Sequence, residues 1–374
     1  YYAELRSKGP FVYIPKYSVL ACGRYDVTKE VFSDHNRFVS SRGVGLQDFK
    51  LAKAWRPPSI ILEADPPDHS RTRKVMARAM SPKAIADLKS SFQIAANDLI
   101  DELLRKPSFD AVIELAEAYP TTVFPAAVGL RNTDSRRLVD YGAMVFNALG
   151  PNNEIRQNAM AKGPDIVPWI TENCKRKNLI SGGIGDAIYA AADAGDITVD
   201  EAGMLVRSLL SAGVDTTVTA IGNALWCLAN NPNEYSKLAA DPELARPAFE
   251  ETMRYTSPVH SFCRTANMDT EVAGINLKQG SKIICVLGAA NLDENRWENA
   301  DRFEINRRTT GHLALGVGVH RCVGQNIARA EGQAILSAIA NKVSSINFES
   351  EVIWRPNNAI RALEKMQISF KPKG

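Results

Sequence analysis

The stretch GVGVHRCVG, residues 316–324, places three glycines, a histidine and an arginine close to Cys322. A helical pattern, VGQNIARAEGQAILSAIA, follows the cysteine at once, and the free N–H groups of a helix N-terminus stabilise a thiolate. Arg321 adds positive charge, and the glycines allow the backbone to approach a flat or bulky group. No second cysteine or histidine stands at zinc-ligand spacing, so these features predict one thiolate ligand to a haem iron. The alternative is a buried structural cysteine beside a glycine turn.

Composition excludes several other classes of protein. The 374 residues carry a net charge of only +3, too little to indicate nucleic-acid binding, and no long uninterrupted apolar run predicts a membrane span. Six cysteines are scattered without a CxxC motif, which predicts a reducing cytoplasm. The chain opens at Tyr1-Tyr2 and shows no signal peptide, so we expect that an N-terminal segment of the native chain is missing.

Apolar spacing predicts a helix-rich fold with a small β portion. Residues 11–25 are typical of a β-hairpin, and a second β region is expected at 262–288. Helical periodicity covers residues 82–106, 110–130, 199–229 and 324–343. Neither a repeat nor a linker divides the chain, so residues 1–374 are expected to form a single domain.

A cationic helix should follow Pro66-Pro67 in EADPPDHSRTRKVMARAM. His69 and Arg73 stand one turn apart on one face of it and would suit the carboxylates of a haem. The alternative is a solvated basic helix.

The predicted helix 199–229 is apolar nearly all round, but its middle, AGVDTT at residues 212–217, is a poor helix interior. The Thr216 hydroxyl can bond back to the carbonyl four residues earlier and bend the helix, and a buried Asp215 needs a partner. The functional interpretation of this stretch is an oxygen-binding groove in which Asp215 and Thr216 transfer protons. The alternative interpretation is structural: polar groups within a core helix whose hydrogen bonds are all satisfied.

GHLALGVGVHRCVG resembles the haem-binding loop of the cytochrome P-450 haem-thiolate monooxygenases. The resemblance implies a triangular helix-rich domain with haem b between the long central helix and the helix after the cysteine. Cys322 would be the axial ligand, and the propionates would be bound by His69, Arg73, Arg264 and His320. The family usually has Phe at the position of Leu315, a change that could shift the redox potential or loosen the loop.

Two further motifs fit the resemblance. Glu251-x-x-Arg254 would form a buried triad with Arg307, which holds the segment before the cysteine loop. Asp215-Thr216 would deliver protons for O–O scission, which favours a true monooxygenase with electrons from NAD(P)H over a peroxide-driven enzyme. A non-enzymatic haem sensor would need a signalling domain or an oligomer interface, and the sequence shows neither.

Several segments, SSRGVGL, AWRPPSIILEADPP, AEAYP, VFNALGP and VRSLLSAGVDTT, resemble the bacterial branch that oxidises para-substituted benzoates. That branch implies O-demethylation or hydroxylation of the para substituent. The substrate carboxylate would bind to Arg56, Ser59 and Ser208, with Arg207 and Ser211 close by. Arg207, Ser208 and Ser211 interrupt an otherwise apolar helix, which agrees with a carboxylate site. A charge-assisted hydrogen bond to the substrate carboxylate would compensate the cost of burying them. The pocket walls would be Leu62, Phe146, Leu149, Val259 and Phe262.

Three departures leave the substrate open. Leu149 replaces an aromatic residue of the best-known relatives, and His260 and Cys263 also differ. A larger acid, such as a cinnamate, is therefore an alternative, as is a neutral terpene or polyketide. With a neutral substrate, Arg56 would serve only to cap a loop and would be dispensable for binding.

Arg71, Lys74 and Arg78 recur at i, i+3 and i+7, opposite His69 and Arg73. With Arg329 they predict a docking face for an acidic iron–sulfur ferredoxin, itself supplied by a ferredoxin reductase. The alternative is a merely solvated face. We expect a monomer.

Overall fold

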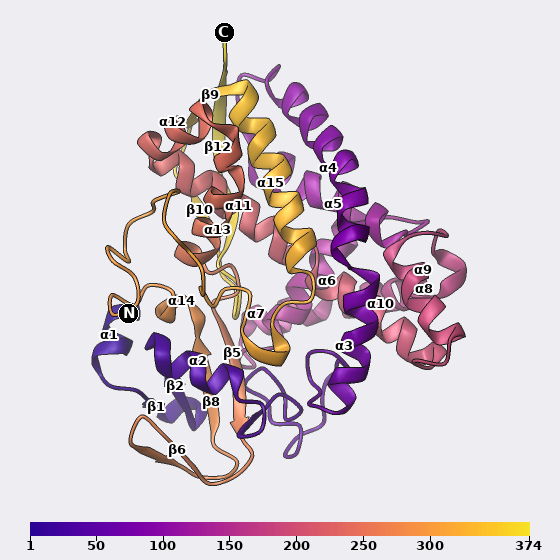
Figure 1. The fold of residues 1–374 in the computed structure, drawn as a ribbon, viewed down its shortest axis with the longest axis vertical. Coiled ribbons are helices and arrows are strands. Elements are labelled where there is room, and N and C mark those ends of the chain that lie inside the picture. The colour runs from indigo at the N-terminus through magenta and orange to yellow at the C-terminus, as the bar shows by residue number, and fades with distance from the viewer.

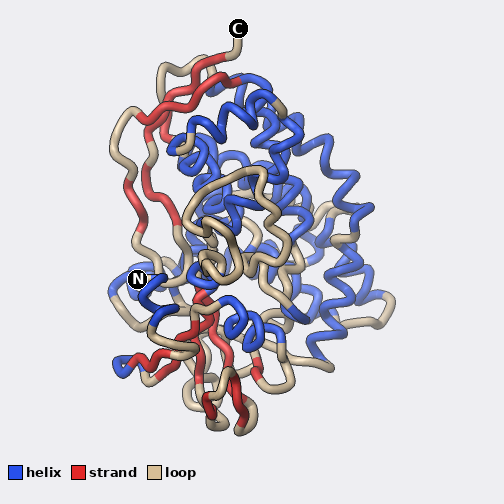
Figure 2. Tube along the Cα trace, turned by 60° about the vertical axis from the view of Figure 1, so that its left-hand side comes forward, coloured by secondary structure: helices blue, strands red, loops and turns tan.

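The computed structural model describes residues 1–374, and it is mainly helical (Figure 1). Strands lie beside the C-terminus, along one side and at the opposite end of the molecule (Figure 2). The helices are α1 Tyr2–Ser7, α2 Tyr25–Ser33, α3 Asp68–Ala79, α4 Pro82–Leu103, α5 Ala118–Val128, α6 Ser135–Asn147, α7 Glu154–Ala161, α8 Gly163–Asn173, α9 Ile184–Asp193, α10 Val199–Ala212, α11 Asp215–Asn230, α12 Pro232–Ala240, α13 Ala245–Thr256, α14 Leu287–Ala290 and α15 Gln325–Lys342.

The strands form four small sheets and confirm both predicted β regions. They are β1 Val12–Ile14, β2 Val19–Cys22, β3 Phe38–Val39, β4 Phe109–Asp110, β5 Ser261–Ala266, β6 Thr270–Val272, β7 Ile275–Leu277, β8 Lys282–Val286, β9 Val343–Phe348, β10 Ile353–Arg355, β11 Ala362–Lys365 and β12 Gln367–Pro372. The largest sheet has the order β1-β2-β8-β5-β3, and only its β2–β8 pair is parallel. The hairpin β1-β2 is therefore joined to the second β region through β8.

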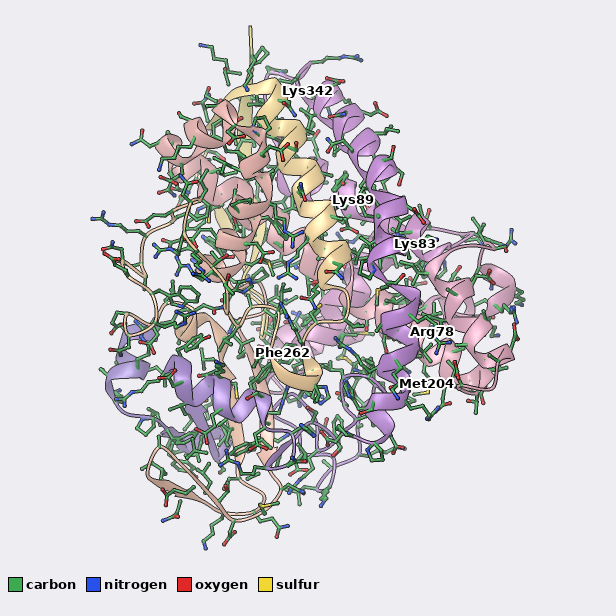
Figure 3. The ribbon with its side chains drawn as sticks, in the orientation of Figure 1. Arg78, Lys83, Lys89, Met204, Phe262 and Lys342 are labelled. Carbon is green, nitrogen blue, oxygen red and sulfur yellow. The ribbon has the colours of Figure 1, made fainter.

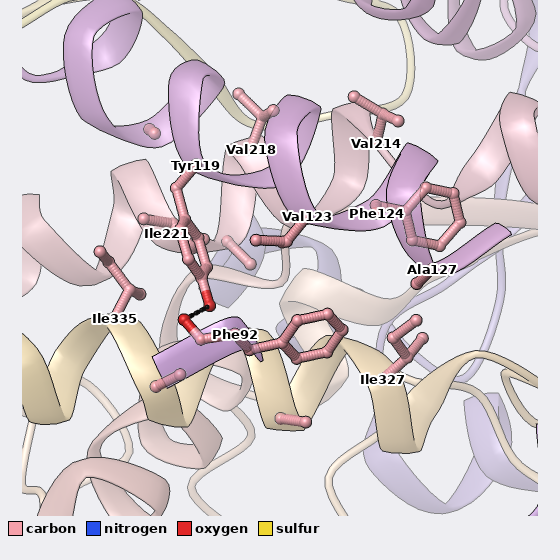
Figure 4. Close-up of a cluster of buried hydrophobic side chains, with 14 of the residues drawn as sticks. Phe92, Tyr119, Val123, Phe124, Ala127, Val214, Val218, Ile221, Ile327 and Ile335 are labelled. Atoms are coloured by element: carbon pink, nitrogen blue, oxygen red, sulfur yellow. Dashed lines mark hydrogen bonds between the residues drawn. The ribbon is translucent and has the colours of Figure 1, made fainter. Parts of the chain in front are cut away.

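The core lies where α4, α5, α11 and α15 meet (Figure 4). Phe92 of α4, Tyr119 of α5, Ile221 of α11 and Ile335 of α15 are all at most 1% exposed. The Tyr119 hydroxyl donates a hydrogen bond of 3.1 Å to the Phe92 carbonyl, so the buried phenol is satisfied. This packing fixes α11 against α15, the helix that follows Cys322.

The predicted helix 199–229 is two helices, because α10 ends at Ala212 and α11 begins at Asp215. A Cβ at Gly213 would lie 2.1 Å from the Phe124 ring, so only glycine fits at the break. Val199–Asn230 is long and apolar enough to cross a membrane, yet 61% of its most apolar window is buried inside the protein. Such burial is typical of a core helix.

Helix 110–130 also differs from the prediction. Its first part is a π-helix, Val112–Glu117, and α5 continues from Ala118. The Ala116 N–H donates to the Ala111 carbonyl five residues back, the spacing of a π-turn.

Candidate active site

Cys322 lies in the turn before α15, half-buried, and its N–H donates to the Leu315 carbonyl at 2.8 Å. Burial raises the pKa of its thiol, while the Gly324 N–H and the charges of Arg73, Arg329 and Arg321 act in the opposite direction. The predicted stabilising groups are therefore present, but burial outweighs them in the free protein. A cation bound to the sulfur would reverse that balance.

The three glycines of this loop have different roles. Gly316 and Gly318 both adopt a φ of +71°, which disfavours any other residue. A Cβ at Gly318 would lie 2.9 Å from the Ser33 carbonyl oxygen, so the close approach there is to α2. Gly324 has a negative φ, and a Cβ on it would lie 4.0 Å from the Cys322 sulfur, an ordinary contact. Our expectation that all three serve a flat ligand is therefore too simple.

A Gly318→Ala variant should be less stable by about 1–3 kcal/mol, because it combines strained φ with a collision against Ser33. Gly195→Ala is the matched control, since Gly195 has a φ of +79° and open space around it. The free energies of unfolding of the two variants, measured in urea, differ by the contribution of the collision with Ser33. Equal losses of stability would show that Ser33 does not constrain the loop.

Two histidines meet beside the cysteine loop. The His69 and His320 ring centroids are 4.3 Å apart, and His69 is 1% exposed with neither ring nitrogen hydrogen-bonded. Burial and the neighbouring His320 and Arg73 lower the pKa of His69 to about 4. The His320 Nε2 atom is also unpartnered, because Asp65 is 3.7 Å away, beyond hydrogen-bond range. Three buried ring nitrogens, two of His69 and one of His320, therefore have no hydrogen-bond partner in the chain, although buried polar groups ordinarily have one.

Arg73 and Arg264 are cations without a carboxylate partner in the chain. Arg264 is 2% exposed, lies 4.0 Å over the Phe32 ring and donates one hydrogen bond, to the Cys263 carbonyl. Burial lowers the pKa of both guanidinium groups. Buried charge without a counter-charge is costly, so an anion from outside the chain would relieve it. The haem group that the cysteine loop implies carries two carboxylates, and these four residues fit it.

Asp215 begins α11 and is fully buried. Its Oδ1 accepts a 2.9 Å hydrogen bond from Arg355 of β10, and its Oδ2 has no partner. Burial raises the pKa of Asp215, and Arg355 opposes that shift. The Thr216 hydroxyl bonds back to the Ala212 carbonyl at 2.6 Å, as predicted, and does not hydrogen-bond the Asp215 carboxylate. Arg355 is a partner that the sequence analysis missed.

The residues predicted to bind a carboxylate do come together. The Ser59 and Ser208 hydroxyls are 3.3 Å apart, and Arg56 and Arg207 both donate to the Pro57 carbonyl. Ser211 bonds back to the Ser208 carbonyl at 3.0 Å.

Glu63 is a further member of this cluster that the sequence analysis missed. Its Oε2 accepts from Arg56 Nη1 at 3.1 Å and from the Ser59 N–H at 2.7 Å. Arg56 Nε is buried without a partner, and Arg207 has no carboxylate partner. The two arginines and one glutamate leave one positive charge in excess.

Four of the five predicted wall residues form one apolar cluster. Phe146 and Val259 pack with Leu149 and Phe262; Phe262 lies near the middle of the molecule (Figure 3). Leu62 is placed elsewhere, beside the carboxylate cluster, where its N–H donates to the Ser59 hydroxyl at 3.2 Å. A cavity of about 300 Å³ adjoins the apolar cluster, and Leu149, Phe262, His260 and Cys263 are among its lining residues.

The predicted triad is present. Arg254 and Glu251 of α13 are fully buried and share two hydrogen bonds of 2.7 Å. Arg307 donates to the same carboxylate at 3.1 Å. Arg254 also donates to three carbonyls, those of Asn291, Ala300 and Arg302. The triad therefore ties α13 to the segment that precedes the cysteine loop.

Three of the four residues of the predicted docking face are paired with carboxylates of this chain, and their role in docking stays a prediction. Arg71 is paired with Glu201, and Arg78 with Asp196 at 2.9 Å; Figure 3 labels Arg78 on α3, which packs against α9. The Arg329 side chain is 11% exposed and paired with Glu250, which disfavours its contact with a partner protein. Only Lys74 is exposed without a carboxylate partner. Helical spacing places charges on one face but does not show which carboxylates another helix brings to them.

Comparison with known proteins agrees with this site. Residues 239–344 match the family model described as Cytochrome P450, and they include the triad glutamate and Cys322. The chain is 49% identical to cytochrome P450 CYP199A2 of Rhodopseudomonas palustris over 98% of this chain and 90% of that protein. It is 33% identical to cytochrome P450 107B1 of Saccharopolyspora erythraea over 85% and 81%.

A solved structure shares the fold. Cytochrome P450 CYP109Q5 from Chondromyces apiculatus superposes with a TM-score of 0.84 at 28% identity, over 100% of this chain and 95% of that one. A thiol before α15, the charge of an Arg73 that has no carboxylate partner, the buried triad and these relatives lead to one assignment. The chain belongs to the cytochrome P450 family and is a monooxygenase whose haem iron is bound by a cysteine thiolate.

Proposed function

We propose that this enzyme oxidises a small aromatic carboxylic acid at its para substituent, by O-demethylation of a methoxy group or hydroxylation of an alkyl group. The observation that supports this most directly is the excess positive charge in the cluster of Arg56, Arg207 and Glu63, beside two serine hydroxyls. One substrate carboxylate would neutralise it through charge-assisted hydrogen bonds. The adjoining aromatic and aliphatic residues would hold the ring.

Haem, when bound, activates O₂ and supplies the oxygen atom that enters the substrate. Cys322 would bind the iron, and His69, Arg73, Arg264 and His320 would hold the two propionates. His69 and Arg264, both almost fully buried, would also keep water away from these carboxylates. In this proposal the Arg56 cluster orients the acid so that its para substituent, at the far end of the ring, faces the iron.

Asp215 and Thr216 would manage the protons of the reaction. Arg355 holds the Asp215 carboxylate by one oxygen and leaves the other without a partner. That free oxygen is available to take a proton or to hydrogen-bond a water molecule. Thr216 would pass the proton on after its hydroxyl releases the Ala212 carbonyl.

The two electrons would come from NAD(P)H through a reductase and an iron–sulfur ferredoxin in the cytoplasm. Two exposed basic side chains are the contacts we propose for an acidic ferredoxin: Arg321, next to Cys322, and Lys74, next to Arg73 on α3. This replaces the larger basic stripe, whose arginines are already paired.

The first test compares 4-methoxybenzoate with its methyl ester in optical titrations of the ferric, haem-loaded protein. A well-placed substrate displaces the iron-bound water and shifts the haem from low to high spin. We expect the acid to cause the shift and the ester not to, because the ester lacks the negative charge. If both bind equally, or neither does, the carboxylate anchor fails, and the family assignment stands.

An Arg207→Gln variant should weaken binding of the acid by roughly 10- to 100-fold, the value of one charged hydrogen bond. Arg176→Gln, an exposed residue paired with Asp193, is the control. A larger acid of the cinnamate type is the second candidate, since Leu149, which stands in place of an aromatic residue, lines a cavity of about 300 Å³. It would be favoured if cinnamates shift the spin state more completely than benzoates.

A further inference from the structure

Lys282, on β8, is 6% exposed and has no carboxylate partner. Its ammonium group donates instead to four backbone carbonyls, those of Arg42, Gly43, Gly45 and Gln47, at 2.7–3.1 Å. Four carbonyl oxygens thus surround a cation in place of water. Burial of a lysine is costly unless such contacts are complete.

The loop that supplies these carbonyls, residues 42–47, is folded round the ammonium. An ion pair between Arg42 and Asp48 joins its two ends. Gly43 adopts a φ of +91°, and a Cβ there would lie 2.6 Å from the Gln47 carbonyl oxygen. The loop has no regular secondary structure, so the Lys282 ammonium is the donor that satisfies four of its carbonyl groups.

The same loop forms one wall of the cavity of about 300 Å³, through Val44, Gly45 and Leu46. The Val44 carbonyl accepts from the Cys263 N–H at 2.7 Å. The Leu46 N–H donates to the Leu149 carbonyl at 2.8 Å, between α6 and α7. The loop therefore connects the β5 strand to the segment that carries Leu149 and supplies the wall of the cavity at this side.

We propose that Lys282 is a positioning residue that acts as a built-in cation for loop 42–47, and that the cavity shaped by this loop admits the substrate. The part of this proposal that concerns substrate rests on the proposed function; the part that concerns the loop does not. Because the ammonium and potassium ions are close in size and both bind rings of carbonyl oxygens, removal of the side chain should leave a site for K⁺.

Two variants separate charge from packing. Lys282→Ala removes the ammonium and leaves space, so K⁺ can enter. Lys282→Met fills much of the space without charge, so the four carbonyls stay unsatisfied whatever salt is present. Lys278→Met is the matched control. Lys278 lies in the turn before β8, and its side chain is 82% exposed and paired with Asp269.

The first measurement is hydrogen exchange at the amides of Gly43, Leu46 and Phe49, each hydrogen-bonded within or from the loop. In choline chloride, both Lys282 variants should lose protection there by at least about tenfold relative to the unchanged protein. Potassium chloride at equal ionic strength should restore protection in Lys282→Ala only. Unchanged protection in Lys282→Ala, or equal rescue of Lys282→Met, would overturn the proposal.

The second measurement is the spin-state titration with 4-methoxybenzoate, in which Lys282→Ala should bind weakly in choline and regain affinity in potassium. A loop effect without any binding of the acid by the unchanged protein would refute the proposed substrate and leave the role of Lys282 intact. Should neither Lys282 variant fold, Gly43→Ala strains the same loop without touching β8. Faster exchange of the loop amides together with an unchanged acid affinity in Gly43→Ala would refute the link between loop order and binding.

Discussion

A Cys322→Ser variant is expected to keep its fold and to lose monooxygenase turnover to the background rate. The thiol lies half-buried in a turn outside the hydrophobic clusters, so its loss removes little packing. A serine hydroxyl does not ionise near neutral pH and cannot supply the thiolate that the iron needs. The carbon monoxide difference spectrum of the reduced protein reports thiolate ligation directly, and turnover is measured with a surrogate ferredoxin and reductase.

Haem content adds a second, independent result. His69, Arg73, Arg264 and His320 remain in the variant, so part of the haem should stay bound without its thiolate signature. Cys174→Ala is the control, because this thiol is 4% exposed in the core and lies far along the chain from the loop. A thiolate spectrum in Cys322→Ser, or its loss in Cys174→Ala, would contradict the assignment of the ligand.

The sequence predicted the parts of the molecule whose signals are local. Helical spacing located α4 and α15, turn residues located the hairpin β1-β2, and Pro66-Pro67 marked the start of α3. The cluster of Arg56, Ser59 and Ser208 was also found, although its members come from two distant segments. There the resemblance to a known branch of the family supplied what spacing alone could not.

Long-range pairs were missed for a physical reason. Arg355 holds Asp215 across 140 residues, and nothing in the spacing of either residue indicates its partner. Even Glu63, only seven residues after Arg56, lies in an irregular segment where no helical or strand period pairs the two. Arg329 looks like an exposed helical residue until α13 brings Glu250 against it. The carbonyl cage of Lys282 is equally hidden, since backbone groups leave no mark in a sequence.

A Glu251→Gln variant should lower the stability of the fold by about 3–5 kcal/mol, because it leaves two arginines beside a neutral group in the interior. The glutamine side chain also replaces one carboxylate oxygen with an NH₂ group, so a donor faces a donor of Arg254 and one hydrogen bond is lost. Such a loss is a large share of the 5–15 kcal/mol that is typical of a folded domain. Urea unfolding followed by circular dichroism should therefore show a much earlier midpoint.

Glu304→Gln is the matched control for this experiment. Glu304 also pairs with Arg307, but its side chain is 40% exposed, so its loss should cost no more than about 1 kcal/mol. An unchanged midpoint in Glu251→Gln would show that the triad does not stabilise the fold.

A double variant, Glu251→Gln with Arg254→Met, tests which contacts of Arg254 matter. Replacing both partners of an ion pair with neutral groups often restores stability. Here Arg254 also donates to the carbonyls of Asn291 and Ala300, which would lose that donor. We therefore expect the double variant to be no more stable than Glu251→Gln. Full recovery would mean that the charge of Arg254 matters and that its bonds to the segment before the cysteine loop do not.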